Sequence, residues 1–357
     1  MKEPKVLVAL SGGVDSSMAA ILLKEQGYDI IGVTLKVYNN YNYRQSSIER
    51  GINDASILSK KLKIPYYVID ILQDFENEII SYFIREYSNG RTPNPCALCN
   101  YTIKWSKLIE IANEFDCQYV ATGHYAKINN ADNRYYLTEA NDILKDQTYF
   151  LWRLNQDFLQ RTLFPLGALT KKETKDFAFE QGFTQIAKKK ESYNICFIPD
   201  GRYRDFLNDR LVRRAGNIIF ENGENAGVHN GIWNFTIGQN KGFTKINNQS
   251  LYVTRINSEE NEIVIGEKDK LLNYYALITE INYMKYESIS ATDNFQAKIN
   301  YKSPLVDCSF SNRNGDIYVH FDKPVVALAP GQSIVFYQRN DLVAGGVISK
   351  ILHPKPQ

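Results

Sequence analysis

The chain lacks the features that mark membrane and exported proteins. No apolar run approaches the roughly 20 residues that a membrane-spanning helix needs. The N-terminal residues Met1–Pro4 lead directly into a strand-like run and show no signal-peptide pattern. These two absences predict a cytoplasmic protein that does not act at a membrane.

Cysteine is also scarce, with five residues in a chain of 357. An odd and sparse set in a large cytosolic chain argues against a disulfide framework and for metal, redox or nucleophilic roles. Cys117 and Cys308 are interpreted as small buried hydrophobes, the usual case for a cysteine. The other three, Cys96, Cys99 and Cys196, have more informative surroundings.

A large charge imbalance is missing too, since the net charge is +2, which by itself predicts no nucleic-acid partner. Basic charge is nevertheless concentrated in residues 188–214, which hold eight Lys or Arg against four acids. Such a patch suits binding to a phosphate backbone, although a solvated helix face would have the same composition. The eight are Lys188, Lys189, Lys190, Arg202, Arg204, Arg210, Arg213 and Arg214.

The length predicts two or three domains, because one ordinary core rarely serves so long a chain. In the first 125 residues, strand-like runs alternate with segments of helical spacing. This alternation predicts an α/β domain with a parallel sheet, whose ligands bind beyond the carboxyl ends of the strands. We expect strands at Lys5–Leu10, Ile30–Val37, Tyr66–Asp70 and Tyr119–Thr122, and helices at Ser16–Glu25, Asp54–Lys63, Phe75–Tyr87 and Ile103–Phe115.

The sequence pattern changes near residue 215, where Gly, Asn and short strand-like runs of alternating polarity become frequent. Regularly spaced short strands predict antiparallel sheet and a small C-terminal β-barrel. We expect a catalytic domain over 1–205, a central domain over 206–275 and the barrel over 276–357. The predicted strands are Leu251–Arg255, Glu262–Gly266, Phe295–Tyr301, Asp316–Phe321, Gln332–Tyr337 and Leu342–Ser349.

The first strand ends in Ser11-Gly12-Gly13-Val14-Asp15-Ser16-Ser17, which opens a helix. Two glycines let the backbone N–H groups point inward, and the helix N-terminus adds partial positive charge, so the segment suits a phosphate group. Asp15 is a candidate helix cap or ligand of a nucleotide-bound Mg²⁺. No Gly-Lys-Ser/Thr closes the loop, which excludes a Walker A motif. The pattern resembles the pyrophosphate (PP) loop of enzymes that adenylate a substrate with ATP.

Two prolines stiffen the segment Gly90–Asn100, which contains Cys96 and Cys99. We expect it to be a loop that leads into the Ile103–Phe115 helix, because proline disfavours helix and central strand. A thiol beside a helix N-terminus is biased toward thiolate, and the three lysines before Cys196 favour the thiolate of that residue.

Several motifs in a fixed order make a more specific resemblance. They are Ser11–Ser17, Arg91–Asn100, Ala121–Tyr125, Lys145–Phe150, Ile195–Ile198 and Pro330–Ser333. With them the chain resembles the tRNA-specific 2-thiouridylase (MnmA) family over nearly its whole length. The resemblance implies ATP with Mg²⁺ as cofactor and the anticodon loop of tRNA as partner. It also implies a sulfur donor such as a cysteine desulfurase or a sulfur-relay protein.

The resemblance also implies roles for individual residues. Cys196 matches the cysteine that carries sulfur as a persulfide, and Cys99 matches the one that attacks it and ends in a disulfide with Cys196. Asn94, Pro95 and Cys96 match the segment that faces the target base. The positions that match tRNA contacts are His124, Lys145, Asp146, Gln147, Asn300, Tyr301 and Gln332. Those that match ATP contacts are Ala9, Leu10, Ser11, Gly12, Gly13, Val14, Asp15, Ser16, Leu35 and Gly123.

Three positions depart from the family pattern. Cys96 replaces an acidic residue to which an acid–base role is assigned, so that proton transfer must have another source here. Asn300 replaces an arginine, which weakens a phosphate contact. Glu191-Ser192-Tyr193-Asn194 replaces the usual acidic-Ser-x-Gly segment before the second cysteine.

The cysteine at position 96 opens a second mechanism. Cys96, Cys99 and Cys196 are enough for three corners of a [4Fe–4S] cluster with one iron open for sulfide, as in related tRNA thiolases. A redox pair or a zinc half-site would share the Cys-x-x-Cys spacing. The persulfide relay and the cluster therefore both remain, and both use Cys99 and Cys196.

Thiolation explains why these motifs occur together. A uracil 2-oxygen leaves poorly until AMP is attached to it, and sulfur must then arrive as a strong nucleophile. An adenylating ligase for a small molecule would explain the Ser11–Ser17 loop but not the cysteines or the basic stretch. A non-catalytic RNA-binding module with a structural metal would not need the loop. The sequence therefore favours ATP-dependent thiolation of the wobble uridine of tRNA.

Overall fold

The computed structural model describes residues 3–37, 47–188, 195–198, 201–243, 250–289, 294–313 and 316–352. The side chains of Ser47 and Arg313 are outside this description. Within these ranges, no helix combines the length and the apolar character required to cross a bilayer.

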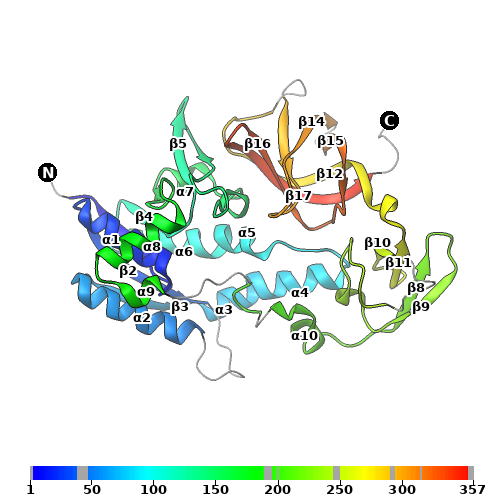
Figure 1. The fold of residues 1–357 in the computed structure, drawn as a ribbon, viewed down its shortest axis with the longest axis horizontal. Coiled ribbons are helices and arrows are strands. Elements are labelled where there is room, and N and C mark those ends of the chain that lie inside the picture. Colours follow the sequence, from blue (N-terminus) through cyan, green and yellow to red (C-terminus); the bar gives the residue numbers. More distant parts are fainter. Residues whose placement is uncertain are drawn as a thin grey trace.

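A parallel sheet forms the N-terminal part of the molecule (Figure 1). Its strand order is β3-β2-β1-β4-β7, and each neighbouring pair is parallel. The strands are β1 (Lys5–Ala9), β2 (Asp29–Lys36), β3 (Tyr66–Asp70), β4 (Tyr119–Ala121) and β7 (Thr162–Leu163). The predicted α/β sheet is confirmed, and the four predicted strands agree with the observed ones within about one residue at each end.

Helices cover both faces of this sheet because its strands are apolar on both sides. Leu7 packs toward α6 (Ser106–Glu114), in a core cluster with Trp105 and Leu108. Val8 packs toward the opposite face, in a cluster with Met18 and Leu58. The helices on that second face are α1 (Val14–Glu25), α2 (Ser47–Leu62), α8 (Lys171–Glu180) and α9 (Thr184–Ala187).

Two long helical segments contain π-helical turns. The first joins α3 (Leu72–Phe75), η1 (Glu76–Ile80) and α4 (Ser81–Ser88), and the second joins α5 (Pro95–Cys99), η2 (Asn100–Trp105) and α6. The expectation that the prolines keep Gly90–Asn100 out of helix is wrong for Pro95–Cys99. Pro95 occupies the first helical position, where no N–H is needed, and Asn94 caps the helix by accepting from the Ala97 N–H at 3.3 Å.

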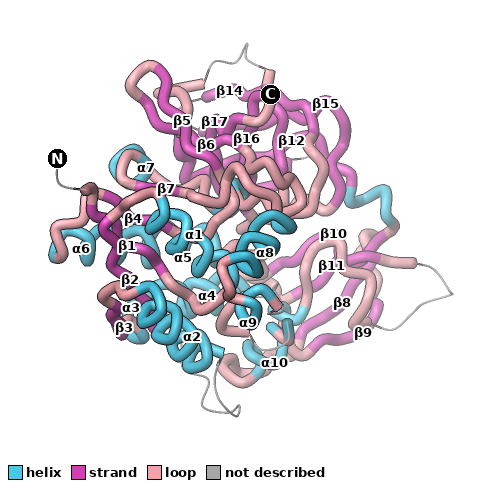
Figure 2. Tube along the Cα trace, turned by 60° about the vertical axis from the view of Figure 1, so that its left-hand side comes forward, coloured by secondary structure: helices cyan, strands magenta, loops and turns pink. Residues whose placement is uncertain are grey.

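A separate sheet of order β10-β11-β8-β9 makes the central part (Figure 2). One core cluster joins this sheet to α4 through Phe83, Phe197 and Val253. Its strands are β8 (Gly216–Phe220), β9 (Asn225–His229), β10 (Tyr252–Asn257) and β11 (Glu262–Gly266), accompanied by α10 (Tyr203–Asn208), η5 (Ile232–Asn234) and η6 (Lys268–Leu271).

The C-terminal strands form the predicted antiparallel barrel, which closes where β12 pairs with both β15 and β17. They are β12 (Leu272–Tyr283), β13 (Phe295–Lys298), β14 (Val306–Arg313), β15 (Asp316–Val326), β16 (Ser333–Gln338) and β17 (Asp341–Leu352). A hairpin of β5 (Lys127–Ala131) and β6 (Arg134–Thr138), which the sequence analysis did not predict, joins the barrel where Thr138 pairs with Asp341.

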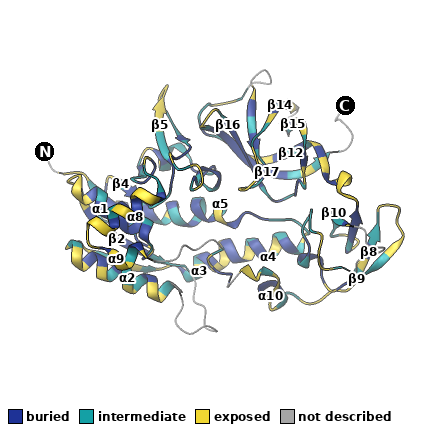
Figure 3. Cartoon of the chain, in the orientation of Figure 1, coloured by how far each residue is buried: buried dark blue, intermediate teal, exposed yellow. Residues whose placement is uncertain are grey.

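The barrel packs on the segment that contains η3 (Thr148–Phe150) and α7 (Gln156–Leu159). Trp152 is fully buried there, against Gly345 of β17. A Cβ on Gly345 would lie 2.6 Å from the Trp152 ring. The barrel can approach this closely because residue 345 has no side chain. Figure 3 shows buried positions along α4, α5 and the barrel strands that face them.

Gly345→Val is therefore expected to destabilise the protein by about 1–3 kcal/mol, because the extra methyl groups overpack the contact with Trp152. Calorimetric thermal unfolding measures the effect. Lys350→Val, at an exposed position of the same strand, is the control and should change stability by less than about 0.5 kcal/mol. Equal unfolding midpoints for the two variants would contradict this account of the junction.

Candidate active site

The Ser11–Ser17 loop lies at the carboxyl end of β1 and opens α1. Its hydroxyls are held by the loop itself. The Ser16 hydroxyl accepts from the Ser11 N–H at 3.1 Å and donates to the Gly13 carbonyl at 3.2 Å. Ser17 donates to the same carbonyl at 2.8 Å, while Ser11 is exposed. The loop is therefore preformed, with the helix N-terminus behind it.

Glycines set the shape of this loop. Gly12 has φ +74°, and a Cβ there would lie 2.3 Å from the Gly51 carbonyl oxygen of α2. Gly123 follows β4, and a Cβ on it would lie 2.5 Å from the Ser16 amide nitrogen. Only glycine fits at these two positions, since other residues would push α2 or the β4 loop away from the start of α1.

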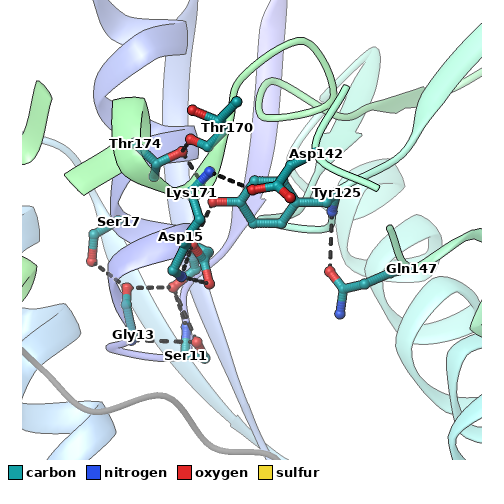
Figure 4. Close-up of polar contacts among 11 residues, drawn as sticks. Ser11, Gly13, Asp15, Ser17, Tyr125, Asp142, Gln147, Thr170, Lys171 and Thr174 are labelled. Carbon is teal, nitrogen blue, oxygen red and sulfur yellow. Dashed lines mark hydrogen bonds and ion pairs between the residues drawn. The ribbon is translucent and has the colours of Figure 1, made fainter. Parts of the chain in front are cut away.

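Asp15 has a different environment from the one that the sequence suggested (Figure 4). Lys171 Nζ of α8 contacts its two carboxylate oxygens at 2.6 and 2.7 Å, and the Tyr125 hydroxyl donates to it at 3.0 Å. Gly13 is the N-cap of α1, with no side-chain capping bond among the described residues, so the capping role considered for Asp15 is wrong. Its carboxylate instead joins the nucleotide loop to α8 and to the turn after β4.

The other expected ATP positions surround the loop. Ala9 and Leu10 end β1 and Val14 begins α1, and of these Leu10 and Val14 are buried. Leu35 is half-buried near the end of β2. These side chains are more suited to packing than to polar contacts with phosphate.

The cysteines converge from two segments. Cys96 and Cys99 lie on α5, and Cys196 lies in the short described stretch 195–198. Cys96 and Cys196 are exposed, whereas Cys99 is 7% exposed. All three are free thiols that influence one another electrostatically, as their pKa shifts below show, so the fold brings Cys196 beside α5.

The expectation of thiolate-biased cysteines is wrong. Desolvation by the segments packed around the sulfurs raises the pKa of Cys99 to about 12 and that of Cys196 to about 11, and it also raises the pKa of Cys96, although Cys96 and Cys196 keep accessible surface. Lys104 opposes these shifts at all three residues, whereas Cys96 and Cys196 reinforce the shift at Cys99. Removal of water from the sulfur outweighs the charge of Lys104. Two of the three lysines expected to favour the Cys196 thiolate, Lys189 and Lys190, lie outside the described residues.

The cluster mechanism can be tested against the arrangement of these side chains. Nowhere in the described ranges do three or more His, Cys, Asp or Glu side chains take positions that could hold a metal ion. The three cysteines as they lie therefore do not fit the corners of a [4Fe–4S] cluster, and no step is derived through one.

The segment predicted to face the base is clamped by the barrel. Asn94 is 9% exposed, and its Nδ2 donates to the Ser333 hydroxyl at 3.0 Å. The Thr92 N–H donates to the Pro330 carbonyl at 2.8 Å. The Tyr149 hydroxyl donates to the Ser333 carbonyl at 2.8 Å and approaches Gln332 Oε1 at 3.4 Å. Asn94 is thus held in place, and Pro95 beside it is buried, while Cys96 remains exposed.

The residues predicted to contact tRNA divide into accessible and buried ones. Tyr301 is 37% exposed and lies with its ring centroid 4.7 Å from that of Phe150. Asp146 is 2% exposed and accepts from the Ala140 N–H and the Thr148 hydroxyl, at 3.0 and 2.6 Å. Its carboxylate therefore shapes the turn, and only the neighbouring Lys145 and Gln147 side chains are partly accessible.

His124 and Asn300 also use their polar atoms within the protein. His124 Nδ1 lies 2.8 Å from the Thr122 hydroxyl, and burial lowers the pKa of His124 to about 3, an effect that Lys104 reinforces. The imidazole is therefore neutral. Asn300 Oδ1 accepts from the Lys302 N–H at 3.0 Å, in a local turn.

The basic stretch 188–214 is only partly described. Lys189, Lys190 and Glu191–Asn194 lie outside the described residues. Arg204 donates to the Asn234 carbonyl and to Gln239, each at 2.8 Å, so it stabilises the central part of the protein. Arg213 and Arg214 are exposed.

The sequence analysis missed several residues of the site. Lys171 stands in the capping box formed by Thr170 and Glu173, but nothing local in the sequence indicates its contact with Asp15. Tyr125, Ser333 and Lys104 likewise acquire their roles only through the fold. Their sequence neighbours are informative, since Tyr125 and Ser333 end two of the motifs.

The parallel sheet, the loop at the end of β1 and the polar network around Asp15 define an ATP-using enzyme of the PP-loop class. Family models match the chain as a tRNA methyl transferase HUP domain over 4–200, a tRNA methyl transferase PRC-barrel domain over 204–267 and an aminomethyltransferase beta-barrel domain over 275–348. The described structure has a sheet or barrel in each range.

Two relatives match almost end to end. The tRNA-specific 2-thiouridylase MnmA of Cytophaga hutchinsonii is 40% identical over 97% of this chain and 98% of its own length. The protein of the same name from Amoebophilus asiaticus is 40% identical over 98% of this chain and 96% of its own. The chain belongs to the tRNA-specific 2-thiouridylase MnmA family.

Among solved structures, the U34-tRNA thiolase NcsA from Methanococcus maripaludis, described with its [4Fe-4S] cluster, is 21% identical. The match covers 58% of this chain and 63% of that chain, with a TM-score of 0.35. A likeness this low does not bear on the mechanism.

Gly12→Ala is expected to lower ATP affinity by roughly tenfold or more, because the positive φ and the contact with Gly51 add about 1–3 kcal/mol of strain to the loop. Isothermal titration calorimetry measures the ATP affinity of the variant and of the wild-type protein. Gly13→Ala, whose Cβ would meet only the Ser11 hydroxyl at 3.4 Å, is the control for folding and should retain the wild-type unfolding temperature. Wild-type ATP affinity in Gly12→Ala would refute this role of the glycine.

Proposed function

We propose that this chain thiolates the 2-position of the wobble uridine in the anticodon loop of tRNA, with ATP as activator. The observation that carries the proposal is the convergence of Cys196 with Cys96 and Cys99, in a chain that also carries a preformed nucleotide loop. The family-model descriptions mention methyl transfer, but paired thiols suit sulfur transfer, and the relatives of nearly full length are named for thiolation.

The first step is adenylation. The loop from Ser11 to Ser17 holds the phosphates of ATP with Mg²⁺, and the uridine 2-oxygen attacks the α-phosphorus. A P–O bond to the base forms, the bond to the β-phosphate breaks and pyrophosphate leaves. The oxygen on C2 is now part of AMP, which is a good leaving group.

The second step is sulfur transfer from a persulfide on Cys196. The terminal sulfur attacks C2 and AMP leaves, which joins the base to Cys196 through a disulfide bond. The Cys99 thiolate then attacks the Cys196 sulfur, and the electron pair of the broken S–S bond stays with the sulfur on C2. The products are 2-thiouridine and a Cys99–Cys196 disulfide, so the two cysteines supply the two electrons.

The exposure of the thiols supports these separate roles. Exposed Cys196 suits reloading by a donor protein that carries its own persulfide, such as a cysteine desulfurase or a relay protein. Buried Cys99 suits a resolving thiol that meets only the intermediate. A thiol reductant must open the disulfide before the next turnover. Since burial raises the pKa of Cys96, this residue is a poor substitute for the acidic residue of the family.

We assign a role in the reaction to each of the three domains. We place ATP chemistry in 1–205, and tRNA contact in 206–275 and in the barrel over 276–357. Clamping of Asn94 by Ser333 supports a base pocket shared by the catalytic part and the barrel. A tRNA substrate also supports a cytoplasmic location for the protein.

The test is transfer of ³⁵S from persulfide-loaded protein to unmodified tRNA with ATP, without iron. Cys196→Ser should neither hold the label nor transfer it. Cys99→Ser should hold the label but form at least about 100-fold less 2-thiouridine, since the resolving thiol is missing. Cys117→Ala, which removes a thiol buried in the sheet core, is the control and should transfer sulfur normally.

Full transfer by Cys196→Ser would reject the relay. Activity that requires about four irons per chain, and that disappears together with the iron in Cys96→Ala, would favour the cluster instead. ATP binding without any thiolation would favour a ligase that acts on a small molecule.

A further inference from the structure

Lys104 is a charged residue of the cysteine site for which the proposed mechanism has no role. It lies in the π-helical turn η2, between Ile103 and Trp105, which are buried. Trp105 is fixed by a hydrogen bond from its indole N–H to the Thr162 hydroxyl at 2.7 Å. The backbone at Lys104 is therefore anchored on both sides.

The π-helical turn decides where this side chain points. Cys99 and Lys104 are five residues apart, which in an α-helix would place them about 140° apart around the axis. A π-helical turn is wider than an α-helical one and is bonded from i to i+5, so it brings Lys104 closer to the side of the axis that carries Cys99, its N-cap residue. Side chains also lean toward the helix N-terminus, which is the direction of Cys99 and Cys96. The wide turn thus brings Lys104 toward the side of the helix that carries the thiols, and its charge acts on all three of them.

No described carboxylate neutralises Lys104. In the part of the chain that the structure describes it forms no ion pair, whereas Lys107, one turn later, contacts Asp74 at 3.0 Å and Glu110 at 3.3 Å. Among the described titratable groups, Lys104 influences the pKa of Cys96, Cys99, Cys196 and His124. His124 is neutral, so the thiols are the groups on which this charge acts.

We propose that Lys104 is a positioning residue of sulfur transfer, whose ammonium group stabilises the anionic sulfur on Cys196 and then on Cys99. The role of Lys104 in sulfur transfer rests on the proposed function, whereas its effect on the thiols does not. The charge is needed because the site withdraws water from the sulfurs and offers them no other described cation. The lysine therefore restores part of the reactivity that burial removes.

The test uses the full chain without ATP or tRNA, so that it does not depend on the thiolase activity. The pH profile of iodoacetamide alkylation is followed at Cys99 and Cys196 by peptide mass spectrometry. Lys104→Met should move both profiles to higher pH and slow alkylation at pH 8 about tenfold, the effect of losing an opposite charge nearby. Lys104→Arg should retain the wild-type profile.

Lys107→Met is the matched control on the same helix and should leave both profiles unchanged. Unchanged profiles in Lys104→Met would overturn the proposal, as would an equal shift in Lys107→Met, which would indicate a general charge effect. If Lys104→Met does not fold, Lys104→Gln is used, and the same outcomes decide. If the wild-type protein does not thiolate tRNA, the proposed function is rejected. The alkylation profiles still test the effect of Lys104 on the thiols, because they need neither ATP nor tRNA.

Discussion

The Ser333 hydroxyl is the point on which the arrangement of this molecule depends. It is 2% exposed and accepts hydrogen bonds from Asn94 at 3.0 Å and from Trp152 at 2.9 Å. Asn94 caps the cysteine helix, Trp152 supports the barrel at Gly345, and Ser333 begins β16. Because buried donors without a partner are costly, the three segments are held in one relative position.

This junction joins the cysteine helix to the barrel. The nucleotide loop is rigid through its own hydroxyls and through Asp15, which binds Lys171. The cysteine helix starts at the capped Asn94 and widens into the π-helical turn that carries Lys104. Burial then has two opposite effects, since it orders the site but raises the pKa of the thiols to which we assign the sulfur transfer.

Much of this was predictable from the sequence, because the parallel sheet, the barrel and the nucleotide loop follow from local patterns. The helix at Pro95 was missed because a proline is a poor helix former in every position except the first turn. The pKa of the cysteines was wrongly predicted because desolvation depends on segments distant in the chain. The contact of Lys171 with Asp15 joins residues 156 apart, and no local pattern indicates such a pair.

The central claim is that transfer of sulfur from Cys196 to the base leaves Cys196 and Cys99 joined by a disulfide bond. A single turnover with iron-free, persulfide-loaded protein, ATP and excess tRNA tests it directly, by counting Cys99–Cys196 disulfide peptides and 2-thiouridine in the same sample. The account predicts about one disulfide for each thiolated base. Thiolated tRNA together with two reduced cysteines would contradict it.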